Sequence, residues 1–121
     1  TKYFGETIWL DKESDINFIT AFFGGGPAYF FLFLKTLTEI LNKKIKDKSI
    51  CDRLILKLLI GTNKYIEKND MNFSSSISKV ASKGGTTEQA INYLNENKKF
   101  QNLIYHAINL AEKKSREMSL K

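Results

Sequence analysis

The stretch Ile16–Leu34, INFITAFFGGGPAYFFLFL, decides which folds are open to this chain, because nineteen consecutive residues carry no charge. On length alone it would qualify as a membrane span. Its centre, however, holds three glycines followed by Pro27, and this combination breaks a helix, since glycine is entropically costly there and proline lacks an amide hydrogen. We therefore predict two helices that meet at a glycine corner, with Pro27 in the first turn of the second helix.

The second of these helices is apolar on nearly all of its faces as far as Leu41. Such a helix must be buried on every side, in a membrane or in a large protein core. A chain of 121 residues offers few positions of that kind, so we expect the helix to be buried against a second copy of the chain. A membrane hairpin over residues 16–41 is the alternative, and it would make the chain insoluble without detergent.

The rest of the chain also shows helical periodicity, which predicts an all-α domain. The expected helices run from near Ser49 to about Glu67, from Phe73 to Val80, from Thr87 to about Asn95, and from about Lys98 to Met118. Ahead of them, residues 7–10 predict a short strand. A single strand cannot stand alone, so this segment indicates the end of a preceding domain or a linker.

Two helix starts have candidate capping residues. Ser49 is a plausible N-cap for the long central helix, with Asp52 in its first turn, and Ser74 or Ser75 is the expected cap of the short helix that follows.

Composition excludes several classes of protein. With 42% hydrophobic and 12% aromatic residues, the chain is not intrinsically disordered. The net charge of +6 invites a nucleic-acid reading, but only Arg53 and Arg116 among the 19 basic residues are arginine, the residue that phosphate and base recognition favours. The single cysteine, Cys51, cannot form an internal disulfide, which favours a reducing, cytoplasmic setting, and its apolar neighbours predict a buried or half-buried residue.

The loop Ser82–Thr87 is the stretch most suited to binding a ligand. Two glycines precede Thr86-Thr87-Glu88-Gln89, which matches a capping box with Thr86 as the cap and Gln89 three positions on. The helix that follows would present unpaired amides and the positive end of its dipole to a carboxylate or phosphate. An ordinary capped loop is the alternative interpretation of the same residues.

Other chemistry has little support. His106, the single histidine, has no cysteine or carboxylate at metal-ligand spacing, so no metal site is predicted. No GxGxxG follows a strand, and no pair of glutamates suggests acid–base catalysis. If the chain is part of an enzyme, the reactive groups would therefore have to be supplied from outside this chain.

Two segments together resemble the pyrroline-5-carboxylate reductase family. Residues 20–30, TAFFGGGPAYF, look like the family's T-A-x-S-G-S-G-P-A-Y signature, and residues 79–87, KVASKGGTT, resemble its V-x-S-P-G-G-T-T loop. Phe23 and Gly25 stand where the family usually has serine, and Lys83 stands where it has proline.

The resemblance implies an interleaved helical dimerisation domain over residues 15–121, similar to the C-terminal domain of 6-phosphogluconate dehydrogenase. Residues 1–14 would then be the last strand and linker of a Rossmann domain that binds NADPH or NADH. It implies a homodimer, often assembled further into a decamer, and partners that include neither nucleic acid nor a membrane. The expected dimer-interface residues are Pro27, Ala28, Tyr29, Phe31 and Leu34.

The resemblance also implies an activity, the reduction of 1-pyrroline-5-carboxylate to L-proline. The hydroxyl of Ser82 and the amides of Gly84, Gly85 and Thr86 would hold the substrate carboxylate, and the hydroxyl of Thr87, the expected catalytic residue, would meet the ring nitrogen. Hydride transfer from a nicotinamide requires no covalent nucleophile. A purely structural oligomerisation module, which would share the fold, is the alternative function.

Overall fold

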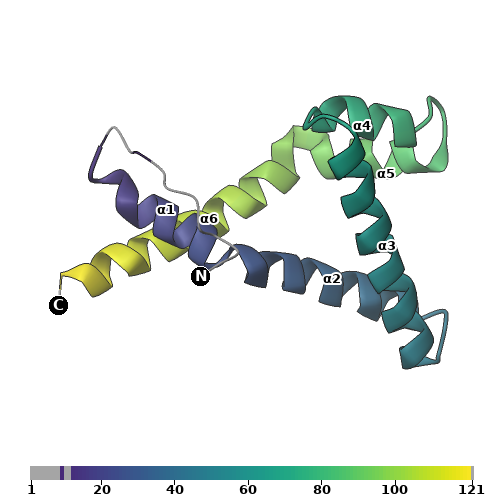
Figure 1. Ribbon diagram of the computed structural model, residues 1–121, viewed down its shortest axis with the longest axis horizontal. Coiled ribbons are helices and arrows are strands. Elements are labelled where there is room, and N and C mark those ends of the chain that lie inside the picture. Colours follow the sequence, from purple (N-terminus) through teal and green to yellow (C-terminus); the bar gives the residue numbers. More distant parts are fainter. Residues whose placement is uncertain (1–8, 10–11, 121) are drawn as a thin grey trace. The chain divides into compact units, whose positions relative to one another are not determined.

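The computed structural model describes residue 9 and residues 12–120, and helices make up most of that part of the chain (Figure 1). The elements are α1 (Asp15–Gly24), α2 (Gly26–Asn42), α3 (Lys48–Lys68), α4 (Phe73–Val80), α5 (Thr86–Asn95), the 3-10 turn η1 (Glu96–Lys98) and α6 (Lys99–Ser119). No strand occurs among the described residues, which confirms the all-α prediction. The strand expected at residues 7–10 lies, apart from Trp9, outside the described residues.

The chain divides into two compact units, residues 1–28 with 101–121, and residues 29–100. In the first unit, α1 and the later part of α6 contribute the buried side chains of Ala21 and Ile108. The hydroxyl of Ser115 on α6 donates a hydrogen bond of 3.0 Å to the side-chain oxygen of Asn17 on α1. These contacts join two segments that lie almost a hundred residues apart in the sequence.

The predicted boundary between two helices lies at the glycines, although Gly25 between them keeps right-handed angles, with φ −90° and ψ −7°. Helix α1 ends at Gly24, Gly25 follows as its C-cap with an amide that donates to the carbonyl of Ala21 at 3.4 Å, and α2 begins at Gly26. Pro27 is the second residue of α2, where the first turn needs no amide donor.

Helix α2 is largely uncovered by the described residues. None of its residues is buried, and Phe30 and Phe31 are each 68% exposed. The hydroxyls of Thr36 and Thr38 donate to carbonyls one turn earlier, at 2.8 Å each, so polar groups of the helix are satisfied internally while its aromatic rings remain uncovered.

The connection between α2 and α3 is built around Cys51, which is completely buried, in agreement with the prediction. Its thiol lies 3.2 Å from the carbonyl oxygen of Ile45, and the Asn42 side-chain amide donates to the same carbonyl at 2.8 Å. The contact between Cys51 and Ile45 therefore holds the turn after α2 against the first turn of α3.

Both predicted N-caps were wrong. Asp47, two residues before Ser49, caps α3 and accepts hydrogen bonds from the amides of Ser49 and Ile50 at 2.9 and 3.4 Å. The helix consequently starts early enough to leave Asp52 beyond the first turn, where it pairs with Lys48 at 2.8 Å.

The cap of α4 is Asn72, whose side-chain oxygen accepts from the amide of Ser75 at 3.1 Å, and neither Ser74 nor Ser75 has that role. In both helices a residue slightly upstream of the expected serine takes the cap position, although serine is about as good a cap as asparagine or aspartate.

The last helix begins one residue later than expected. Asn97 and Lys98 have positive φ angles of 53° and 55°, so the chain makes a left-handed bend before α6 starts at Lys99. The ammonium of Lys99 lies 3.1 Å from the centre of the Tyr93 ring, a cation–π contact across this bend.

Apolar exposure is the main feature of the whole chain. Among the described residues only Ala21, Cys51 and Ile108 are buried hydrophobic side chains. Many large apolar side chains are more than half exposed, among them Phe30, Phe31 and Leu32. The helical stretch Asp15–Asn42 is long and apolar enough to cross a membrane by length and composition alone, but a core helix of a soluble protein meets the same criterion.

Candidate functional site

The loop between α4 and α5 depends on two glycines. Gly84 has a φ angle of +75°, a left-handed conformation that is costly for any residue with a Cβ. The amide of Gly85 donates to the carbonyl of Ser82 at 2.9 Å. A Cβ at Gly85 would lie 2.7 Å from the rotatable Ser82 hydroxyl oxygen and 3.0 Å from the Ser82 carbonyl oxygen. Gly84 is therefore required by its φ angle, and Gly85 is favoured by the crowding at Ser82.

The predicted capping box was wrong. Gly85, in an extended conformation, is the N-cap of α5 and forms no side-chain cap. Thr86 is already the first helical residue, because the left-handed Gly84 turns the chain into the helix one residue earlier than the Thr–x–x–Gln pattern implies. The carboxylate that reaches back to the loop belongs to Glu88, which accepts a hydrogen bond of 3.1 Å from the amide of Gly84.

The start of α5 therefore presents amides that its own chain does not use. Within the described part of the chain, the amides of Thr86, Thr87 and Glu88 form no hydrogen bond, whereas those of Gly84 and Gly85 are engaged. Unpaired amides at the positive end of a helix dipole attract an anion. Of the three amides expected to hold a carboxylate, only that of Thr86 is free in this structure, and those of Thr87 and Glu88 lie next to it in the same turn.

The side chain of Thr87 lines a groove of about 950 Å³ that lies wholly within residues 29–100. The groove is lined by Phe30 and Phe33 of α2, Lys57, Leu58, Gly61, Thr62, Tyr65 and Ile66 of α3, Phe73, Ser76, Ile77 and Val80 of α4, and Thr87 and Ile91 of α5. Ser82, Gly84, Gly85 and Thr86 are not among the lining residues. Of the predicted site residues, only Thr87 therefore lines the apolar groove.

The five expected interface residues all lie on α2, the helix without a buried residue. Pro27, Tyr29 and Leu34 are half-buried, and Ala28 and Phe31 are exposed.

His106 lies exposed on α6 with its ring edge-on to Tyr105. Over the described residues, no group of three or more His, Cys, Asp or Glu side chains is placed to hold a metal ion.

Sequence reasoning missed two residues of this region. In the sequence Glu88 stands inside the capping pattern with no assigned role, although an acidic residue in the first turn after a glycine pair is well placed to accept a loop amide. Lys57, the only charged residue in the groove lining, carries no signal in the sequence, because the groove is lined by residues of four different helices.

Comparison with known proteins gives a consistent picture. A family model described as pyrroline-5-carboxylate reductase dimerisation matches residues 13–118. The pyrroline-5-carboxylate reductases of Pseudomonas aeruginosa and Pasteurella multocida are 33% and 32% identical over 115 residues, which is 95% and 94% of this chain. The chain spans 42% of the length of each of these relatives.

Solved structures agree. The Coxiella burnetii pyrroline-5-carboxylate reductase matches with a TM-score of 0.79 at 30% identity, over 91% of this chain and 40% of that one. The Plasmodium falciparum pyrroline carboxylate reductase with NADP bound matches with a TM-score of 0.77 at 29% identity, over 88% of this chain and 40% of that one. The helices, the glycine loop and these likenesses together show that the chain belongs to the pyrroline-5-carboxylate reductase family, within which it matches the dimerisation domain.

Proposed function

We propose that this chain is the dimerisation and substrate-binding domain of an enzyme that reduces 1-pyrroline-5-carboxylate to L-proline with NADPH or NADH. The observation that carries the proposal is the glycine-built start of α5, with unpaired amides and the hydroxyl of Thr87 in one turn, in a chain of this family. The substrate combines a carboxylate with an imine nitrogen, and this turn offers amide donors for the first and a hydroxyl for the second.

In this proposal the residues of the chain bind and orient the ring. The Ser82 hydroxyl and the amide of Thr86 hold the carboxylate, with the amides of Thr87 and Glu88 as further donors and Gly84 and Gly85 shaping the turn. The hydroxyl of Thr87 meets the ring nitrogen, where charge changes during reduction. A positioned donor next to developing charge is an effective catalytic device.

The nicotinamide cofactor, which supplies the hydride, does not fit the residues present here. The 121 residues contain no strand–GxGxxG–helix unit, so we assign the nucleotide to a Rossmann domain whose last strand and linker would be residues 1–14. A solved relative that contains NADP supports this class of cofactor.

The partner in the same proposal is a second copy of the chain. Helix α2 leaves its aromatic residues exposed, and the matching family model describes a dimerisation domain. We extend the proposal to a cytoplasmic enzyme that does not insert in a membrane and whose dimers assemble further, with a decamer as the expected form.

The test is the turnover of the complete protein with 1-pyrroline-5-carboxylate and NADPH. We expect Thr87→Ala to lower kcat by roughly a hundredfold or more, while Thr87→Ser, which keeps a hydroxyl, retains most of the activity. Light scattering should give the same oligomer for all three proteins. A wild-type protein that oligomerises but does not reduce the substrate would favour the structural module, and unchanged turnover in Thr87→Ala would remove Thr87 from the mechanism.

A further inference from the structure

Residues 82–85 form a tight turn whose second residue is Lys83. The amide of Gly85 donates to the carbonyl of Ser82 at 2.9 Å, and Gly84 has a φ angle of +75°, whereas that of Lys83 is not positive. A hydrogen bond across four residues, with a positive φ at the third alone, is the geometry of a type II turn. Lys83 therefore occupies the position of the turn in which proline is common.

The turn itself gives no reason for a lysine at this position. Lys83 is exposed, and among the described residues its amide donates no hydrogen bond and its ammonium forms no ion pair. Proline would fit here without the loss of a hydrogen bond, and it would also reduce the freedom of the unfolded chain. The charge of Lys83 is therefore not used to hold the loop together.

This charge lies close to the amides that the start of α5 leaves free. Lys83 is the only charged residue among residues 82–87. Thr86 follows it by three residues, which span at most about 11 Å, and charges are screened over about 10 Å at 0.1 M salt. The carboxylate of Glu88 is fixed by its bond with the amide of Gly84, whereas the flexible ammonium of Lys83 is free to move towards an anion at these amides.

We infer, on the basis of the function proposed above, that Lys83 is a further substrate-binding residue, whose ammonium attracts the carboxylate of the substrate and offsets the opposing charge of Glu88. A lysine supplies a point charge on a flexible stem, while the amides of α5 supply directional hydrogen bonds. The carboxylate takes no part in hydride transfer, so the attraction is equal in the ground state and the transition state. Binding of this kind lowers KM and leaves kcat unchanged.

The experiment compares Lys83→Gln, Lys83→Pro and Lys83→Arg in the complete protein. We expect Lys83→Gln and Lys83→Pro to raise KM for 1-pyrroline-5-carboxylate about two- to fivefold with kcat unchanged, and Lys83→Arg to stay close to the wild type. Lys83→Pro should melt no lower than the wild type, since the turn accepts proline. This variant therefore separates the loss of the charge from a loss of the turn.

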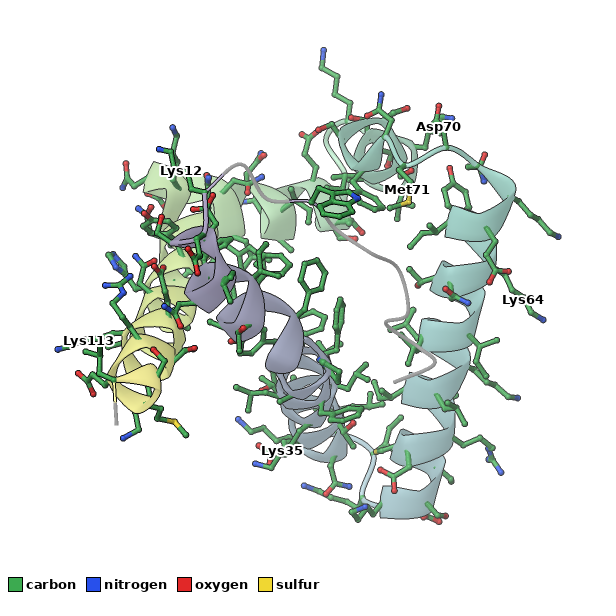
Figure 2. The ribbon with its side chains drawn as sticks, turned by 60° about the vertical axis from the view of Figure 1, so that its left-hand side comes forward. Lys12, Lys35, Lys64, Asp70, Met71 and Lys113 are labelled. Atoms are coloured by element: carbon green, nitrogen blue, oxygen red, sulfur yellow. The ribbon has the colours of Figure 1, made fainter. Side chains whose placement is uncertain are left out.

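Lys64→Gln is the matched control, because it removes the same charge from an exposed position on α3. Figure 2 shows the side chain of Lys64 pointing out from that helix. KM should be unchanged in this variant. A rise in KM equal to that of Lys83→Gln would show that the net charge of the chain, and not the position of Lys83, attracts the substrate.

Ionic strength separates an electrostatic effect from a structural one. The screening length falls from about 30 Å at 0.01 M salt to about 3 Å at 1 M, so the difference in KM between Lys83→Gln and the wild type should shrink over this range. Equal KM values at low salt would overturn the inference and leave the proposed function intact. A change in KM for NADPH alone would overturn it as well, since Lys83 would then serve the cofactor. A wild type that does not reduce the substrate would contradict the proposed function, and the inference with it.

Discussion

The carboxylate of Glu88 holds the glycine loop to the first turn of α5 through its hydrogen bond with the amide of Gly84. A negative charge at this end of a helix is favourable, because it faces the positive end of the dipole. The same charge lies in the turn whose free amides, in the proposed function, receive the substrate carboxylate. Glu88 should therefore stabilise the loop and oppose substrate binding at once.

Replacement of Glu88 by glutamine separates these two effects. Glutamine keeps an oxygen that can accept from Gly84 but removes the charge, so we expect KM for 1-pyrroline-5-carboxylate to fall about two- to fivefold, equivalent to about 0.4–1 kcal/mol, with kcat unchanged. Steady-state kinetics of the complete protein measures both constants. Glu117→Gln removes the same charge from the exposed end of α6 and should leave KM alone. A KM that rises in Glu88→Gln would mean that the carboxylate of the substrate is held elsewhere.

At this scale the sequence predicted the position of the turn better than its backbone geometry. The glycine pair and the two threonines identified the turn, and the structure bears out the need for glycine at Gly84 and the preference for it at Gly85. The cap could not be predicted, because a threonine three residues before a glutamine fits a helix that starts at either of two positions. The positive φ angle at Gly84 decides between them, and no local pattern encodes that angle.

Helices were predicted well where composition forces a break and less well at their starts. Three glycines and Pro27 mark a helix boundary clearly, whereas the region before α3 offers several residues that can cap a helix. Asp47 takes the cap position there because a carboxylate can accept from two amides and a hydroxyl together. Choosing among near-equivalent caps requires knowing the backbone angles at each.

The Asp47 cap predicts a dependence of stability on pH. The Ser49 hydroxyl first, and then the amides of Ile50 and Ser49, lower the pKa of Asp47 from its usual 3.8. A carboxyl whose pKa is lower in the folded state contributes stability above its unfolded pKa and loses it as the pH falls through the folded value. The contribution of Asp47 should therefore be complete at neutral pH, begin to decline near about pH 4, and be lost once the pH has fallen below the folded pKa.

We expect Asp47→Asn to melt close to the wild type at neutral pH, since asparagine is also a good cap. On acidification the melting temperature of the wild type should fall more steeply than that of Asp47→Asn. Thermal melts from about pH 6 to about pH 2 measure the difference, with Glu117→Gln as a variant that removes a carboxyl outside any cap. Parallel curves for the wild type and Asp47→Asn would show that the cap makes no charge-dependent contribution.

For the whole molecule, the sequence indicated that the chain associates with a partner. It did not indicate which surfaces of the two chains are in contact. The apolar helix after Pro27 was expected to require burial, and in the structure α2 has no buried residue. Which face of one chain meets which face of the other depends on shape, and the apolar groove is lined by residues of α2, α3, α4 and α5 together. Periodicity within one helix cannot predict it.

The scarcity of buried side chains leads to a prediction about the chain as a whole. With three buried hydrophobic residues among those described, folding should be coupled to association, and the unfolding temperature should then rise with concentration. We expect each tenfold dilution of the 121-residue chain to lower the melting midpoint by about 3–5 °C, measured by circular dichroism over a hundredfold range. Light scattering on the same samples should show a dimer throughout the native baseline. A midpoint that does not move with concentration would mean that each chain completes its own core, and α2 would then have to be covered by segments of the same chain.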